Sequence, residues 1–219
     1  MLTLTIINQQ MKPFKVLLDN NAEVNIHNTY DGTSPLIQSC MFKSYDSEFA
    51  KILIERKANV NDVEVGKRRE GNSTRFTPLI AASREGKLDL VQILIKNGAN
   101  INYENEFHQS ALSSCVMQDR YDVTIYLLKS GVNYLRPIFY RPSDDVVNNP
   151  KEDKPIYLID MLREDFFELD SQEYKYKMKV VEFLKSKGVD YSKAPIPDYI
   201  KKKAVENYPD SWQEYIQKY

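Results

Sequence analysis

The chain has 219 residues, 42% of them hydrophobic and 28% charged, which is the composition of an ordinary globular protein. Its 30 basic and 31 acidic side chains leave a formal net charge of −1, so no overall field draws it to nucleic acid or to an anionic membrane. No apolar run reaches the roughly 18 residues of a membrane-spanning helix, and the N-terminus lacks the basic start and cleavage site of a signal peptide.

Residues 1–28 are predicted to form an incomplete first pair of helices. The chain starts inside a helix at Leu2, and Pro13 lies at the start of the second helix, where proline is tolerated. Leu4 and Ile7 leave apolar side chains beside the first helix, where the end of a stack normally carries polar ones. Two interpretations remain open: a natural start with an apolar edge, or the tail of a longer array, which we favour.

Residues 29–66 are predicted to form the second pair, with Pro35 opening its first helix. An extended loop over residues 63–74 follows, and its tip carries the basic run 67–69 close to glycines. We expect a solvated turn at this tip, and contact with an acidic partner is the alternative.

Residues 72–104 carry the clearest pattern. Thr77 can cap a helix whose first position is Pro78, and Gly86 can end that helix in a left-handed conformation. A second helix follows, because apolar residues recur three and four positions apart, and Gly98 closes it. A unit of two such helices is too small to bury its own apolar faces, so it needs neighbours.

Residues 105–136 are predicted to form the fourth pair, although Ala111 replaces the opening proline and Asp119 stands where Gly86 stood. The next segment, residues 137–153, lies in a stretch with three prolines and little periodicity. We therefore expect a long loop or an extended turn there.

Residues 154–193 are predicted to form the fifth pair, with Pro155 in the opening slot and an insertion over residues 163–179. The insertion either lies between the two helices or lengthens them. Residues 194–219 are predicted to form a helical cap that covers the last pair. The face of this cap is apolar at a helical spacing, through Trp212, Tyr215, Ile216 and Tyr219.

The closing part of each pair recurs along the chain, for example as KILIERKANVN from Lys51 and QILIKNGANIN from Gln92. Successive core leucines are 36, 41, 33 and 57 residues apart, and they are Leu17, Leu53, Leu94, Leu127 and Leu184. A 33-residue helix–turn–helix period with a Thr-Pro-Leu opening is the ankyrin signature. The chain therefore resembles an ankyrin-repeat protein over about residues 1–191.

This resemblance implies an all-α solenoid of about five stacked helix–turn–helix repeats, with finger-like turns between them and a C-terminal helical cap. It also implies that Asn25, Asn61 and Asn102, which follow the second helices, bridge adjacent turns by hydrogen bonds. The whole chain, residues 1–219, is then expected to be a single ankyrin-repeat domain.

Cys40 and Cys115 are predicted to lie two repeats apart, too distant for a disulfide. Free, buried thiols are typical of a reducing compartment, so we expect a cytoplasmic protein, with delivery into a host cell as an effector as the alternative.

The residues of metal and catalytic chemistry are sparse. His27 and His108 lie in different repeats, and no Gly-rich phosphate loop or nucleophile elbow is present. We therefore expect no catalytic residues, no metal and no cofactor.

The family binds partners with its finger tips and with the concave ends of its first helices, and the repeat register transfers this to the present chain. The predicted partner-binding residues are Tyr30, Met41, Phe42, Phe76, Arg84, Glu85, Phe107, Met117, Gln118 and Met161. Methionine at three concave positions suits an adaptable apolar surface. Burial of these residues by the protein's own loops, or a shifted register, are the alternatives.

The sequence thus predicts a non-catalytic, monomeric scaffold that captures a protein or peptide and binds neither nucleic acid nor a membrane. The alternatives are a C-terminal targeting array that is part of a larger enzyme or secreted effector, and an array that associates with itself.

Overall fold

A computed structural model describes residues 1–65, 75–141 and 153–219 of the chain. The basic run 67–69 and most of the predicted loop 137–153 lie outside the described residues. The chain packs as two compact units, Met1–Gln118 and Asp119–Tyr219, here called the N-terminal and C-terminal units. The boundary between them falls inside the segment that was predicted as the fourth repeat.

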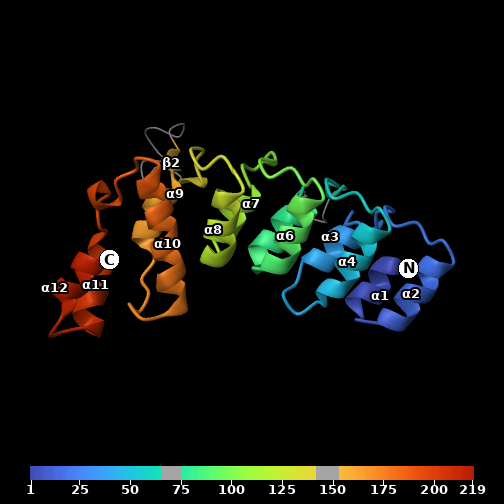
Figure 1. Ribbon diagram of the computed structural model, residues 1–219, viewed down its shortest axis with the longest axis horizontal. Helices are drawn as coiled ribbons and strands as arrows, with labels where there is room; N and C mark the ends of the chain where they lie inside the picture. Colours follow the sequence, from blue (N-terminus) through green and yellow to red (C-terminus); the bar gives the residue numbers. More distant parts are fainter. Residues whose placement is uncertain (66–74, 142–152) are drawn as a thin grey trace, which may run out of the picture. The chain divides into compact units, whose positions relative to one another are not determined.

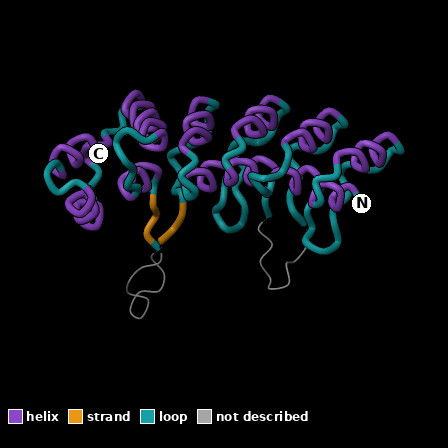
Figure 2. The backbone as a smooth tube through the Cα atoms, turned by 90° about the horizontal axis from the view of Figure 1, so that it is seen from below, coloured by secondary structure: helices purple, strands orange, loops and turns teal. Residues whose placement is uncertain are grey.

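The N-terminal unit consists of short antiparallel helix pairs (Figure 1). In chain order its helices are α1 (Leu2–Ile7), α2 (Met11–Asp19), α3 (Pro35–Cys40), α4 (Ser47–Glu55), α5 (Pro78–Glu85), α6 (Leu88–Lys96) and α7 (Ala111–Val116). The first helices pack in sequence, α1 on α3, α3 on α5 and α5 on α7, and α4 packs on α6. Figure 2 shows that loops of this unit turn out to one side of the helices.

The first helices begin where a hydroxyl group can cap them. The side chains of Ser34, Thr77 and Ser110 each accept a hydrogen bond from the backbone N–H three residues later, at 3.4, 3.2 and 3.1 Å. Such a cap satisfies one of the free N–H groups at a helix start. Helix α7 lacks the opening proline, but the Oγ of Ser113 accepts a hydrogen bond from the N–H of Ser110 at 2.8 Å. The missing proline is therefore offset by a reciprocal capping box.

The second helices end in one repeated geometry. In each of them a residue in the left-handed region is followed by an N–H that donates to the carbonyl of the core leucine, at 2.9–3.2 Å. The five leucine acceptors are those of the sequence period, Leu17, Leu53, Leu94, Leu127 and Leu184. Glycine holds the left-handed position in three helices, whereas Asn21 (φ 61°) and Lys57 (φ 66°) hold it in the first two. This bond pattern satisfies carbonyls at the helix ends.

Asparagine side chains link consecutive turns in the N-terminal unit. The Asn25 Oδ1 accepts the N–H of Asn59 at 2.8 Å, and the Asn61 Oδ1 accepts the N–H of Asn100 at 2.7 Å. Asn61 also donates through its Nδ2 to the Gly98 carbonyl at 2.9 Å. The predicted bridging role is confirmed for Asn25 and Asn61, and for Asn102 it stays a prediction.

Lys87 connects the second and third helix pairs from the turn between α5 and α6. Its side chain is buried, and its Nζ donates to the carbonyls of Ser39 at 3.2 Å and Tyr45 at 2.8 Å. Ser39 lies in the last turn of α3, where carbonyls lack partners within the helix. Burial lowers the pKa of Lys87. A buried ammonium thus ties the end of one repeat to the next.

The C-terminal unit contains α8 (Tyr121–Lys129), α9 (Leu158–Glu164), α10 (Gln172–Ser186), a 3₁₀ turn (Tyr191–Lys193), α11 (Asp198–Asn207) and α12 (Trp212–Lys218). Strands β1 (Phe139–Arg141) and β2 (Lys154–Ile156) pair antiparallel, with Tyr140 opposite Pro155. The fold is helical as predicted, apart from this small ribbon. The two ends of the expected loop are therefore strands among the described residues.

The insertion predicted over residues 163–179 partly lies between the two helices and partly lengthens the second of them. Helix α10 has 15 residues and packs on α8, and only residues 165–171 connect α9 to α10. The predicted cap is helical, and Ile200, Ala204, Tyr215 and Tyr219 form a buried cluster in it. The rings of Phe166 and Tyr215 lie 4.8 Å apart, so the connection packs against the cap.

The cap is also bonded to the connection through backbone carbonyls. The Tyr219 hydroxyl donates to the carbonyls of Arg163 and Asp165, both at 2.7 Å. The Tyr215 hydroxyl donates to the Phe167 carbonyl at 2.8 Å. Aromatic rings with a polar end can fill a core and still satisfy the carbonyls of a loop.

Lys177 of α10 is buried within this arrangement. Its Nζ donates to the Asp165 carbonyl at 3.0 Å and lies 3.7 Å from the centre of the Tyr219 ring. Burial lowers the pKa of Lys177 to about 7, and burial raises the pKa of Asp165 to about 6, although the Tyr121 hydroxyl donates to its carboxylate. Both groups are therefore costly to charge in the folded unit.

The first prediction concerns the pH dependence that Lys177 creates. Its pKa falls from 10.5 to about 7 on folding, so the unfolded chain binds more protons between these values and stability is lost as the pH falls through that window. Lys177→Met lacks this titration. The unfolding free energy of the natural protein should therefore rise relative to that of Lys177→Met between pH 7 and pH 9.5, by up to about 1.4 kcal/mol per pH unit. Urea unfolding followed by Trp212 fluorescence measures it, since Trp212 is the single tryptophan and lies in the cap. Parallel pH profiles for the two proteins would contradict this role.

The second prediction concerns Lys87. Lys87→Met leaves the carbonyls of Ser39 and Tyr45 without this donor, so we expect a loss of about 1–3 kcal/mol in unfolding free energy. Lys15→Met is the matched control, because Lys15 is exposed on α2. Chemical denaturation followed by circular dichroism compares the three proteins, and equal midpoints for both variants would remove the structural role of Lys87.

Candidate functional site

A pocket of about 490 Å³ opens beside the end of α3 in the N-terminal unit. It is lined by Ile7, Tyr30, Asp31, Gln38, Met41, Phe42 and Tyr45. Three of the predicted partner-binding residues, Tyr30, Met41 and Phe42, therefore lie around one hollow. We call this the α3 pocket.

The finger turn that carries Tyr30 is closed by its own hydrogen bonds. The Asn28 side chain accepts the N–H of Tyr30 at 2.7 Å, and the Asp31 carboxylate accepts both the N–H and the hydroxyl of Thr33, at 2.9 and 2.7 Å. The backbone of Gly32, in the left-handed region, donates to the Asn28 carbonyl. Local bonding thus fixes the turn, while the Tyr30 side chain stays 75% exposed.

The other wall of the pocket is the turn between α3 and α4. Phe42 is 48% exposed, and its ring lies 5.0 Å from that of Tyr45. Neighbouring repeats hold this turn from both sides, because the N–H of Lys43 donates to the Glu85 carboxylate and the N–H of Asp46 donates to the Gln9 side chain. The aromatic pair is therefore presented on a backbone that distant residues position.

The lining of the pocket is mainly apolar, and Asp31 supplies its charged side chain. Gln38 is buried and lies within hydrogen-bond distance of the Thr33 hydroxyl, which keeps its amide in place at the floor. Such a surface suits an apolar side chain of a partner, with room for a basic or hydrogen-bonding group next to Asp31.

Farther along the N-terminal unit, Phe107 and Met117 are about half exposed, at 48% and 49%, and Gln118 and Arg84 are exposed. Met117 follows α7 directly, as Met41 follows α3. Arg84 and Met117 therefore lie at ends of first helices equivalent to that of Met41, whereas Phe107 lies in the finger before α7. Phe107, Arg84, Met117 and Gln118 are not among the residues that line the α3 pocket.

The expectation that Phe76 is exposed is wrong. Phe76 is 4% exposed, and the guanidinium of Arg84 lies over its ring at 5.8 Å from the centre. The N–H of Glu64 donates to the Phe76 carbonyl, which holds the residue beneath the finger. Arg84, rather than Phe76, is available to a partner at this repeat.

The expectation that Met161 stands at the concave end of its helix is also wrong. Residues 154–156 pair as strand β2, so α9 begins at Leu158, three residues later than the Pro155 slot implies. Met161 is consequently in the middle of α9 and only partly exposed, and the adjacent Leu162 is fully buried. Glu164 takes the end position and is paired with Arg141 at 2.8 Å.

Sequence reasoning did not assign Ile7, Asp31, Gln38 or Tyr45 to the site. Ile7 is noticeable in the sequence as an apolar residue near the edge, and the structure places it, 42% exposed, in the pocket wall. Tyr45 carries no signal of its own, because its position depends on how the turn after α3 is held.

Titratable and metal-binding groups are dispersed in this unit. His27 lies 3.1 Å from the Asp62 carboxylate and His108 lies 2.8 Å from that of Glu104, so each belongs to a finger. Burial raises the pKa of the unbridged Cys40 thiol to about 12. Among the described residues no group of three or more His, Cys, Asp or Glu is arranged to hold a metal ion. No helix of the described part is long and apolar enough to cross a membrane.

Comparison with known proteins identifies several similarities. The family model for ankyrin repeats, in three copies, matches residues 2–105 and 63–137. An ankyrin repeat protein of Acanthamoeba polyphaga mimivirus is 27% identical over 100 residues, which are 45% of this chain and 60% of that protein. An ankyrin repeat protein of Variola virus is 33% identical over 93 residues, which are 42% of this chain and 15% of that protein. The chain thus spans less than two thirds of either relative.

Proposed function

Because the chain belongs to the ankyrin-repeat family, whose repeats generally mediate protein–protein interaction, we propose that it is a non-catalytic module that binds a protein or peptide at the α3 pocket. The observation that carries this proposal is the gathering of exposed Tyr30, half-exposed Phe42 and Met41 around one hollow. Aromatic and methionine side chains of this kind supply most of the energy at protein interfaces.

The arrangement of the first helices suggests how far a partner would extend. Met41, Arg84 and Met117 follow or end α3, α5 and α7, and each of these helices packs on the next. Met41 and Met117 are therefore separated by two interhelical steps of about 8–10 Å each. An extended peptide of about six residues covers such a distance, at about 3.3 Å per residue.

The proposed partner is a protein or peptide rather than a nucleic acid or a membrane, since the net charge is −1. We place the protein in a reducing compartment, because the buried Cys40 thiol forms no disulfide. The similarity to viral proteins supports the cytoplasm of an infected cell as that compartment.

A second candidate function is an array that positions other parts of a longer protein, such as an enzyme or effector. The supporting observation is that the 93 matched residues cover only 15% of the Variola virus relative. In that case the α3 pocket would contact a segment of the same polypeptide.

The third prediction tests the pocket. Peptides are selected from a random display library on the intact protein, and their dissociation constants are then measured for variants. Phe42→Ala should weaken binding about tenfold, because a central aromatic contact is worth more than about 1 kcal/mol. Met117→Lys should weaken those peptides that reach the end of α7.

Val16→Ala is the control for this experiment, since Val16 is an exposed apolar residue on α2 outside the pocket. Peptides that bind the Phe42→Ala protein as tightly as the natural one would show that the pocket is not the binding site. Circular dichroism of each variant verifies that the helices are intact.

A further inference from the structure

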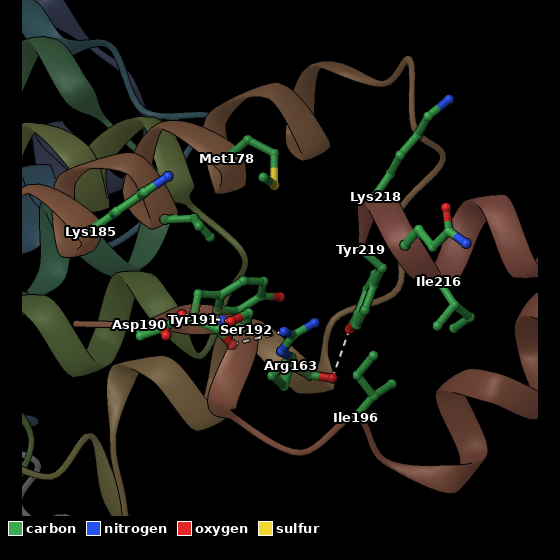
Figure 3. Close-up of a pocket in the computed structure, with 12 residues that line it drawn as sticks. Arg163, Met178, Lys185, Asp190, Tyr191, Ser192, Ile196, Ile216, Lys218 and Tyr219 are labelled. Atoms are coloured by element: carbon green, nitrogen blue, oxygen red, sulfur yellow. Dashed lines mark hydrogen bonds between the residues drawn. The ribbon is translucent and has the colours of Figure 1, made fainter. Parts of the chain in front are cut away.

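A second cavity, of about 560 Å³, lies entirely within the C-terminal unit, between α10 and the end of the cap (Figure 3). Its walls include Met178 and Val181 of α10, and Ile196 and Ile216 of the cap region. Its volume is in the range of about 300–1,000 Å³ that is usual for small-molecule sites. We call it the cap cavity.

Arg163 supplies the charged floor of this cavity. Its side chain is 5% exposed, and Figure 3 shows the guanidinium pointing into the cavity between Tyr191 and Tyr219. The guanidinium carbon lies 3.7 Å from the centre of the Tyr191 ring and 5.8 Å from that of Tyr219. The two rings therefore fix the plane of the guanidinium and its direction.

The hydrogen-bonding capacity of Arg163 is largely unused. Its Nη2 donates to the Tyr191 carbonyl at 2.8 Å, whereas its buried Nε has no hydrogen-bond partner. No carboxylate of the described residues forms an ion pair with it. A buried cation without a counterion is costly, so each such group calls for an explanation.

The neighbouring charges do not provide the missing counterion. On the rim of the cavity Lys185 is exposed, and Lys218 is paired with Glu214 at 2.5 Å. Asp190 also lines the cavity, but its carboxylate is bonded to Ser192 and lies 3.6 Å from the Lys193 ammonium. The interior of the cavity thus presents one positive charge surrounded by apolar and aromatic side chains.

We propose that the cap cavity binds a small monocarboxylate with an apolar body, whose carboxylate pairs with the Arg163 guanidinium while the body lies against Met178, Val181 and Ile216. A guanidinium with free donors matches a carboxylate in geometry and in charge. A phosphate would bring about two negative charges and needs more donors than this apolar site offers. This site lies outside the α3 pocket and does not depend on the proposed protein binding.

The experiment uses octanoate as the probe and the intact protein, with binding measured by calorimetry and by NMR titration. Octanol has the same chain without the charge, and octylamine carries the opposite charge. Octanoate should bind at least tenfold more tightly than either. Equal binding of octanoate and octanol would overturn the proposal, because the guanidinium would then have no role.

Three variants locate the binding. Met178→Trp fills the cavity from a partly exposed position and should weaken octanoate at least tenfold, whereas Glu182→Trp, on α10 outside the lining, should leave it unchanged. Arg163→Lys keeps the charge but loses the planar fork, and should weaken octanoate about tenfold. If Arg163→Lys does not fold by Trp212 fluorescence, the pair of tryptophan variants decides the question.

Competing ligands test the chemical class. Inorganic phosphate should fail to displace octanoate at equal concentration, and displacement would identify a general anion site instead. If octanoate does not bind and a tripeptide of leucines with a free C-terminal carboxylate does, the proposal of a small-molecule ligand is overturned. The ligand of the cap cavity would then be the C-terminal end of a peptide. Unchanged octanoate binding in Met178→Trp would place the site elsewhere and overturn the proposal.

Discussion

The helices of the N-terminal unit contain only six to nine residues, so a single pair cannot bury its apolar side chains and must pack against the next pair. Leu53, Leu79 and Leu94 are almost completely buried in this way. Because the packed faces are committed to the core, side chains at the helix ends and in the fingers are the ones free to vary. The α3 pocket lies at such a place, where a finger meets the end of a first helix.

The repeat could be predicted from the sequence because its signals are local. Capping hydroxyls and helix-ending leucines act within a few residues of their positions, and the period between leucines follows. The left-handed backbone conformation is kept even where glycine is replaced: Asp119 has a φ of 55° at the position equivalent to Gly86, which has a φ of 71°. The loss of glycine therefore weakens the sequence signal without changing the backbone.

The errors arose where distant residues decide the outcome. Met161 was misplaced because the pairing of β1 with β2 delays the start of α9, and such pairing has no local signature in a proline-rich segment. Phe76 is buried, although its position in the finger predicts exposure. The Arg84 side chain and the finger backbone cover it, and these tertiary contacts have no local sequence signal. Tyr45 of the α3 pocket was missed for the same reason, since Glu85 and Gln9 position the turn that carries it.

The asparagine bridges of the N-terminal unit act in series, because each side chain joins one turn only to the next. Under a mechanical load applied along the unit, bonds in series all carry the same force, so the weakest bridge breaks first. The repeats should therefore detach one after another and not all at once. The unit would then extend in discrete steps, one for each repeat that detaches.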